Sequence, residues 1–124
     1  MIDFKNGALL KLKPVGIGSM IKDINKFLIE GEEVLEVFKT VRDQVVFTNK
    51  RVITANVQGI TGKKVDYTSI PYKRIGMYSV ETSGALDLDS ELALNVSGVK
   101  GTILFEFRGR TKILEIARYI SEAI

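Results

Sequence analysis

After Gly31 the chain consists of short runs in which apolar and polar residues alternate, with turn-forming residues between the runs. In one of them, Ile53, Ala55 and Val57 alternate with polar residues, which predicts a strand with one buried and one solvent-exposed face. The runs recur about every 8–12 residues, a spacing typical of an antiparallel meander. We predict about seven strands, in runs at residues 33–41, 44–48, 53–58, 64–70, 75–81, 91–96 and 102–107.

The last element is predicted to be an amphipathic helix over residues 111–124, with its regular pattern from about Lys112. Glu115, Arg118 and Glu122 occupy the face opposite the apolar one. A helix with one apolar face has to cover an apolar surface, and the open end of the meander provides one. The apolar face is formed by Ile113, Ile116, Ala117, Ile120 and Ile124.

The N-terminal segment, residues 1–30, is predicted to be irregular up to Gly18 and helical afterwards. Ser19 is a suitable N-cap, Gly31 ends the element, and apolar residues between Met20 and Leu28 follow helical spacing. With strands over 32–108 and the capping helix over 111–124, residues 1–124 form a single domain, because no linker or repeat interrupts them.

Composition argues against most catalytic and cofactor chemistry. The chain has no histidine and no cysteine, so the usual general base, thiolate ligands and disulfides are absent. We therefore expect no enzymatic activity and no cofactor. The net charge of +3 is small and unclustered, which disfavours nucleic acid as a partner. Apolar runs are too short to span a bilayer, and the start does not resemble a secretory signal, so the expected location is cytoplasmic.

One acidic stretch could in principle bind calcium. Asp87, Asp89 and Glu91 supply oxygen ligands at close spacing. An EF-hand loop counted from Asp87 would need glycine and glutamate where the chain has Leu92 and Gly98, so that motif is excluded. We predict no bound metal; the stretch is either an exposed acidic strand edge or a contact with a partner or neighbouring subunit.

Several stretches together resemble the bacterial pleckstrin-homology-like (PHb) domain family, and they cover nearly all of the chain after Gly31. They are EVFKTVRD at 36–43, FTNKRVI at 47–53, SIPY at 69–72, SVETSG at 79–84 and DLDSEL at 87–92. The resemblance implies a mainly β fold, a PH-like two-sheet antiparallel barrel capped by the last helix. It also implies ring-like homo-oligomers that act through protein contacts, without enzymatic activity. The predicted helix from Met20 to Leu28 is an addition to that layout.

Two functions remain open from the sequence. The first is a self-assembling scaffold, a cyclic homo-oligomer that binds an unidentified protein through polar residues at strand ends. The apolar face of the helix from Met20 to Leu28 supports it, because that face has to cover either this chain's own sheet or a neighbour's. The predicted contact residues are Arg42, Asp43, Arg51, Glu81 and Asp87. The alternative is a peripheral membrane module that binds anionic lipid head groups through Lys39, Arg42 and Lys50.

Overall fold

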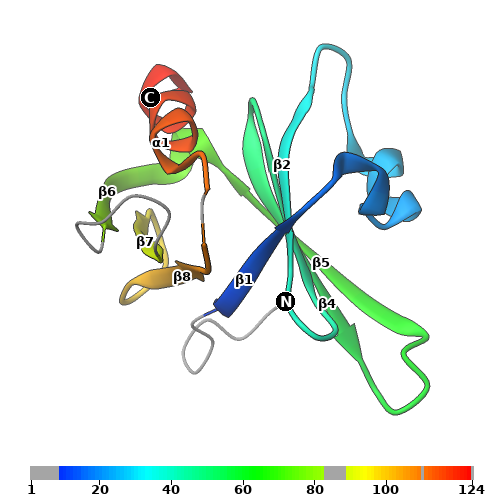
Figure 1. Ribbon diagram of the computed structural model, residues 1–124. Helices are drawn as coiled ribbons and strands as arrows, with labels where there is room; N and C mark the ends of the chain where they lie inside the picture. The colour runs from blue at the N-terminus through cyan, green and yellow to red at the C-terminus, as the bar shows by residue number, and fades with distance from the viewer. Residues whose placement is uncertain (1–8, 83–88, 110, 124) are drawn as a thin grey trace.

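The computed structural model describes residues 9–82, 89–109 and 111–123, which form one curled eight-stranded sheet and a C-terminal helix (Figure 1). The strand order is β5-β4-β3-β2-β1-β8-β7-β6. Consecutive strands pair antiparallel, except that β5 and β6 form the two ends of the sheet, and β1 and β8 pair parallel. The strands are β1 Leu9–Val15, β2 Val34–Lys39, β3 Gln44–Thr48, β4 Arg51–Gln58, β5 Lys64–Pro71, β6 Ile75–Thr82, β7 Ser90–Val96 and β8 Ile103–Phe107.

Strand β1 is the first difference from the sequence prediction, which treated this segment as irregular and counted about seven strands. It pairs with β2 on one side and β8 on the other, so it joins the two halves of the sheet. The pairing is irregular between Leu9 and Leu12, and Lys11 has a φ of 59°. Leu12 is fully buried between the halves, and its carbonyl accepts the Arg108 N–H at 2.8 Å.

The predicted helix from Met20 to Leu28 is wrong in its type. One 3-10 helix, η2 (Lys22–Phe27), lies within this segment, and another, η1 (Ile17–Ser19), precedes it; neither has a side-chain N-cap. The side chain of Gln44 accepts the N–H of Ile21 and donates to the Ser19 carbonyl, both at 2.9 Å. These bonds hold the chain between the two helices, where a continuous α-helix would need those groups itself.

A main core lies between the two halves of the sheet and the helix α1 (Ile113–Ala123), as the sequence predicted. The β8 residues Ile103, Phe105 and Phe107 are buried there. The apolar face of α1 joins them; of its predicted residues, Ile124 lies outside the described part. In Figure 1 the helix sits over the half formed by β6, β7 and β8.

A second core lies on the other face of β2, β3 and β4, beneath the 3-10 helices (Figure 1). It contains Met20, Ile24 and the β4 residues Ile53 and Ala55. The sequence predicted that β4 has one solvent-exposed face. That prediction is wrong over residues 52–55, because the 3-10 helices cover one face while Val52 enters the main core. The surplus apolar segment near the N-terminus therefore covers this chain's own sheet.

In the described part of the chain, no helix is both long and apolar enough to cross a membrane.

Candidate interaction surfaces

Arg51, predicted as a contact residue, is held by Glu32. Its Nε and Nη2 each donate to one Glu32 carboxylate oxygen at 2.9 Å, and Nη2 also donates to the Phe27 carbonyl. The Glu32 side chain is 0% exposed and that of Arg51 is 19% exposed. Burial raises the pKa of Glu32, but hydrogen bonds from Arg51, Thr48 and the Ile29 N–H outweigh it, so this pKa lies below its ordinary value. The charge of Arg51 is therefore largely neutralised within the chain.

Arg42 and Asp43 are also engaged locally, at the β2–β3 turn. Asp43 accepts the Val57 N–H at 2.9 Å and an N–H of the Asn56 side chain at 3.1 Å. Arg42 donates to the Gly59 carbonyl in the β4–β5 turn. These bonds fix the β2–β3 turn against β4 and the turn that follows it, so both residues have a structural role in the monomer.

The three predicted lipid-binding cations do not share one surface. Lys39 pairs in register with Gln44, so Lys39 and Arg42 lie beside the start of β3. Lys50 follows the end of β3, at the opposite end of the strand. A strand of this length separates the two ends by roughly 17 Å. Lys39 and Arg42 could face one membrane patch together, but Lys50 could not contribute to it.

The acidic stretch is only partly described, since Asp87 lies outside the described residues. Asp89 accepts the Gly109 N–H at 3.0 Å and pairs with Arg108 at 2.8 Å; these contacts, the backbone bond first, keep the pKa of Asp89 low. Glu91 pairs in register with Glu81 on β6. Within the described ranges, acidic residues form no cluster that could hold a metal ion.

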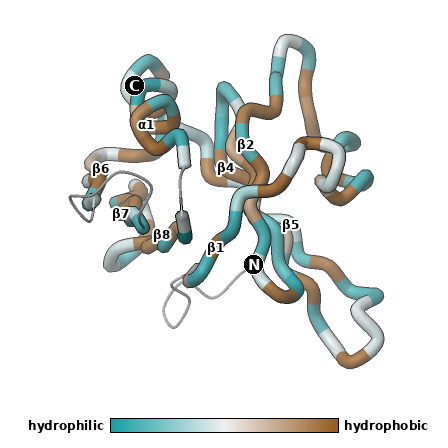
Figure 2. Tube along the Cα trace, in the orientation of Figure 1, coloured by the Kyte–Doolittle hydropathy of each residue, from teal (hydrophilic) through white to brown (hydrophobic). Residues whose placement is uncertain are grey.

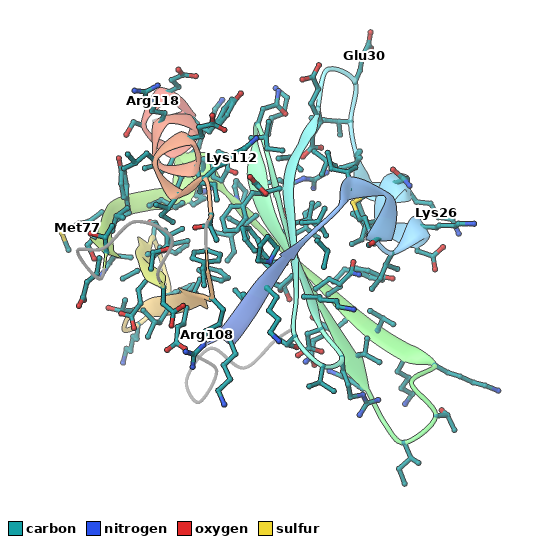
Figure 3. The ribbon with its side chains drawn as sticks, viewed as in Figure 1. Lys26, Glu30, Met77, Arg108, Lys112 and Arg118 are labelled. Carbon is teal, nitrogen blue, oxygen red and sulfur yellow. The ribbon has the colours of Figure 1, made fainter. Side chains whose placement is uncertain are left out.

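The two ends of the sheet are open. Strands β5 and β6 are its terminal strands, and each pairs over its length with one neighbour among the described residues. On β6 the Met77 side chain is 68% exposed and points away from the body of the molecule (Figure 3). Beside this strand, a hollow of about 370 Å³ is lined by Tyr78 and by residues of α1 that include Leu114 and Ala117. The open edge thus lies next to a recess in the surface.

Two neighbouring turns carry fully exposed apolar residues. Val41 is in the β2–β3 turn and Ile60 in the β4–β5 turn, and the Arg42–Gly59 hydrogen bond ties these turns together. The hydrophobic segment at the tip of the β4–β5 hairpin is visible in Figure 2. Lys63 and Lys64, both exposed, follow Ile60 in the same hairpin. The surface formed by these two turns therefore combines exposed apolar side chains with exposed lysine side chains.

A curled sheet closed by a C-terminal helix, with polar turns and no catalytic constellation among the described residues, defines a PH-like domain. The bacterial PH domain family model matches residues 3–124, and the chain belongs to this family. It is 40% identical over 119 residues to the uncharacterized protein YjqA of Bacillus subtilis, covering 95% of each chain.

Two solved structures agree with this assignment. The first is a DUF1696 family protein with a pleckstrin-homology domain from Shewanella loihica, with a TM-score of 0.74 and 35% identity over 92% of this chain and 97% of that one. The second is a pleckstrin homology domain from Shewanella amazonensis, with a TM-score of 0.60 and 40% identity over 88% of each.

Proposed function

We propose that this chain is a non-catalytic PH-like module that pairs with copies of itself through the open edge of β6, forms a closed cyclic homo-oligomer and acts as a protein-binding scaffold. The observation that carries the proposal is the edge of an eight-residue strand that pairs on one side only within residues 9–82, 89–109 and 111–123. Unpaired backbone N–H and C=O groups along such an edge are a template for another strand.

The residues of β6 do little to block such pairing. Lysine and proline on an edge strand are common protections against unwanted contacts. Strand β6, with the sequence IGMYSVET, contains neither, and in the other edge strand, KVDYTSIP, they stand only at the first and last positions. Met77 adds an exposed apolar side chain to the unprotected edge. Of the predicted contact residues, Glu81 is the one on this strand.

Pairing of β6 with β5 of the next copy would use both open edges of the sheet. If the two strands run antiparallel, the start of β5 lies beside the end of β6, so Lys64 of one copy approaches Glu81 of the next. Contacts between two different surfaces of one protein produce a ring when the rotation closes. A cyclic homo-oligomer therefore satisfies both edges, whereas an isologous β6–β6 dimer would leave β5 open.

Light scattering after size exclusion tests the proposal. The wild-type chain should have a single discrete mass that is a multiple of 13.8 kDa and larger than 13.8 kDa itself. Met77→Lys places a charge on the edge strand and should shift the mass toward the monomer. The matched control is Asn95→Lys, because Asn95 is exposed and in register with Met77 but lies on the interior strand β7. A wild-type monomer, or equal effects of the two variants, would contradict edge pairing.

A second candidate function is binding to an anionic membrane surface. It is favoured by the exposed Val41 and Ile60 at adjoining turns, with Lys39, Arg42 and Lys63 nearby. Apolar tips that enter the headgroup region while cations contact anionic lipid are a common means of peripheral attachment.

Co-sedimentation with phosphatidylglycerol-containing vesicles tests this second candidate. The wild-type chain should sediment at low salt and be released at high salt, because salt screens surface attraction. Ile60→Asp should abolish sedimentation, and Ile17→Asp, at another exposed apolar residue, should leave it intact. No sedimentation of the wild type, or equal losses in both variants, would exclude this function.

A further inference from the structure

A groove of about 590 Å³ lies between the β3–β4 turn and the last turn of α1. It is lined from one side by the turn and by the end of β5, and from the other side by residues of the helix. Its volume is within the range of roughly 300–1,000 Å³ typical of ligand sites. It is separate from the open β6 edge and from the β2–β3 and β4–β5 turns, so neither proposed function accounts for it.

One wall of the groove is fixed in place by hydrogen bonds. The Asn49 side chain accepts the Glu33 N–H at 2.9 Å and donates to the Gly31 carbonyl at 3.0 Å. The Glu32–Arg51 ion pair connects the same two segments. Binding to a wall that is already ordered costs less conformational entropy than binding to a mobile loop. The groove is thus suited to receive a ligand without rearrangement.

The charge on the groove is positive. Lys50 and Lys73 are exposed, and neither forms an ion pair with a residue in the described part of the chain. Arg51 lines the groove too, but Glu32 neutralises it. Among the described residues that line the groove, Glu122 is the one with a carboxylate. Two uncompensated lysines against one glutamate favour a ligand with negative charge.

Apolar surface lies beside these cations. Ile29 is 59% exposed at the rim, and Pro71 and the half-buried Tyr119 add further apolar area. A simple inorganic anion would leave this area uncovered. We infer that the groove binds a short peptide segment of a partner protein in which acidic residues stand next to apolar ones. The acidic side chains would pair with the two lysines, and their apolar neighbours would cover Ile29 and Tyr119.

Fluorescence anisotropy with the full chain tests the inference. The probe is a labelled peptide of alternating aspartate and leucine, and a peptide of alternating asparagine and leucine is the comparison. The double variant Lys50→Glu/Lys73→Glu should weaken binding of the acidic peptide by about tenfold or more, because each exposed charge pair contributes up to about 1 kcal/mol and the reversal adds repulsion. Lys100→Glu/Lys11→Glu, two exposed lysines outside the groove, is the charge-matched control and should change binding about twofold at most.

A second pair of variants tests the apolar part of the groove. Ile29→Ser should weaken binding of the acidic peptide several-fold. Ile17→Ser, at an exposed isoleucine elsewhere, should leave this binding unchanged. The inference is overturned if the acidic peptide does not bind, or if the asparagine peptide binds as tightly. Equal losses of affinity for the acidic peptide in the groove variants and the control variants would also overturn it. A change in the mass of the chain in the lysine variants would overturn it too, because a second copy would then occupy the groove. Edge pairing is tested with Met77→Lys, a residue outside the groove, so the two proposals can fail separately.

Discussion

The carboxylate of Glu32 connects the loop before β2 to the β3–β4 turn. It accepts hydrogen bonds from the Thr48 hydroxyl at 2.7 Å, from the Ile29 N–H at 3.1 Å and from two groups of the Arg51 guanidinium. A bidentate pair between a guanidinium and a buried carboxylate is geometrically specific. Removal of one partner leaves a partly buried charge without compensation.

We expect Glu32→Gln to lower the free energy of unfolding by about 2 kcal/mol, because Arg51 loses its counter-ion while the amide retains part of the hydrogen bonding. Urea denaturation measures the difference. The control is Glu30→Gln, since Glu30 is exposed and projects from the loop before β2 (Figure 3); its effect should stay within about 0.5 kcal/mol. Equal effects of the two changes would show that the ion pair contributes nothing.

The contribution of Glu32 should depend on pH in a definite direction. Its pKa is lower in the folded protein than the ordinary value of 4.5. The stabilisation is therefore fully present above pH 4.5 and is lost as the pH falls through the lower folded-state pKa. The difference in unfolding free energy between wild type and Glu32→Gln should accordingly shrink in acid. A difference that stays constant from pH 7 to pH 3 would contradict this assignment.

The sequence indicated Arg51 as a candidate contact residue but did not indicate its partner. Glu32 precedes the first predicted strand and belongs to no recognisable motif, so its pairing with Arg51 follows only from how the loop folds over the β3–β4 turn. The same holds for Asp43, whose acceptor role depends on the position of β4. Local sequence identifies charged turn residues, but it does not show which of them form ion pairs or hydrogen bonds within the chain.

Among the secondary-structure elements, the 3-10 helix η2 differs most from the sequence prediction. The sequence left open whether this segment covers the chain's own sheet or that of a neighbouring copy. It covers the second core, in which Ile24 is fully buried. Phe27 lies further along the same element, and its ring centroid is 4.9 Å from that of Tyr67 on β5. The element is therefore part of the folded monomer.

Ile24→Ala should lower the free energy of unfolding by about 2–4 kcal/mol, the usual cost of a cavity at a fully buried isoleucine. Ile17→Ala, in the preceding 3-10 helix and half exposed, should cost less than about 1 kcal/mol. Denaturant titration of both variants measures these costs. If Ile24→Ala behaves like Ile17→Ala, η2 does not seal the second core.

Elements whose pattern is local were predictable, and those that depend on distant partners were not. The predicted runs at 91–96 and 102–107 form strands β7 and β8, and the turn between them has positive φ at Gly98 and Gly101. The apolar face of α1 was also evident. Strand β1 was not, because Pro14 and an irregular pairing obscure its alternation, and its partner β8 lies about ninety residues away in the chain.

For the molecule as a whole, the main consequence of the topology is a sheet whose terminal strands, β5 and β6, each pair with one neighbouring strand among the described residues. In the described part, α1 and the 3-10 helices cover the faces of the sheet, and the strand ends are held by internal hydrogen bonds. The edges are thus the part of the backbone left for contact with another strand. This places the proposed self-association on β6 and leaves the polar turns to stabilise the monomer.

Hydrogen–deuterium exchange across β6 tests this edge pairing most directly. If β6 pairs with another copy, amides within Ile75–Thr82 should exchange more slowly in the wild type than in Met77→Lys. Strand β7 is paired with β6 and β8 in both proteins, so its amides should exchange at the same rate in the wild type and in Met77→Lys. Equal exchange of β6 in the two proteins, with circular dichroism showing both folded, would contradict self-association through this edge.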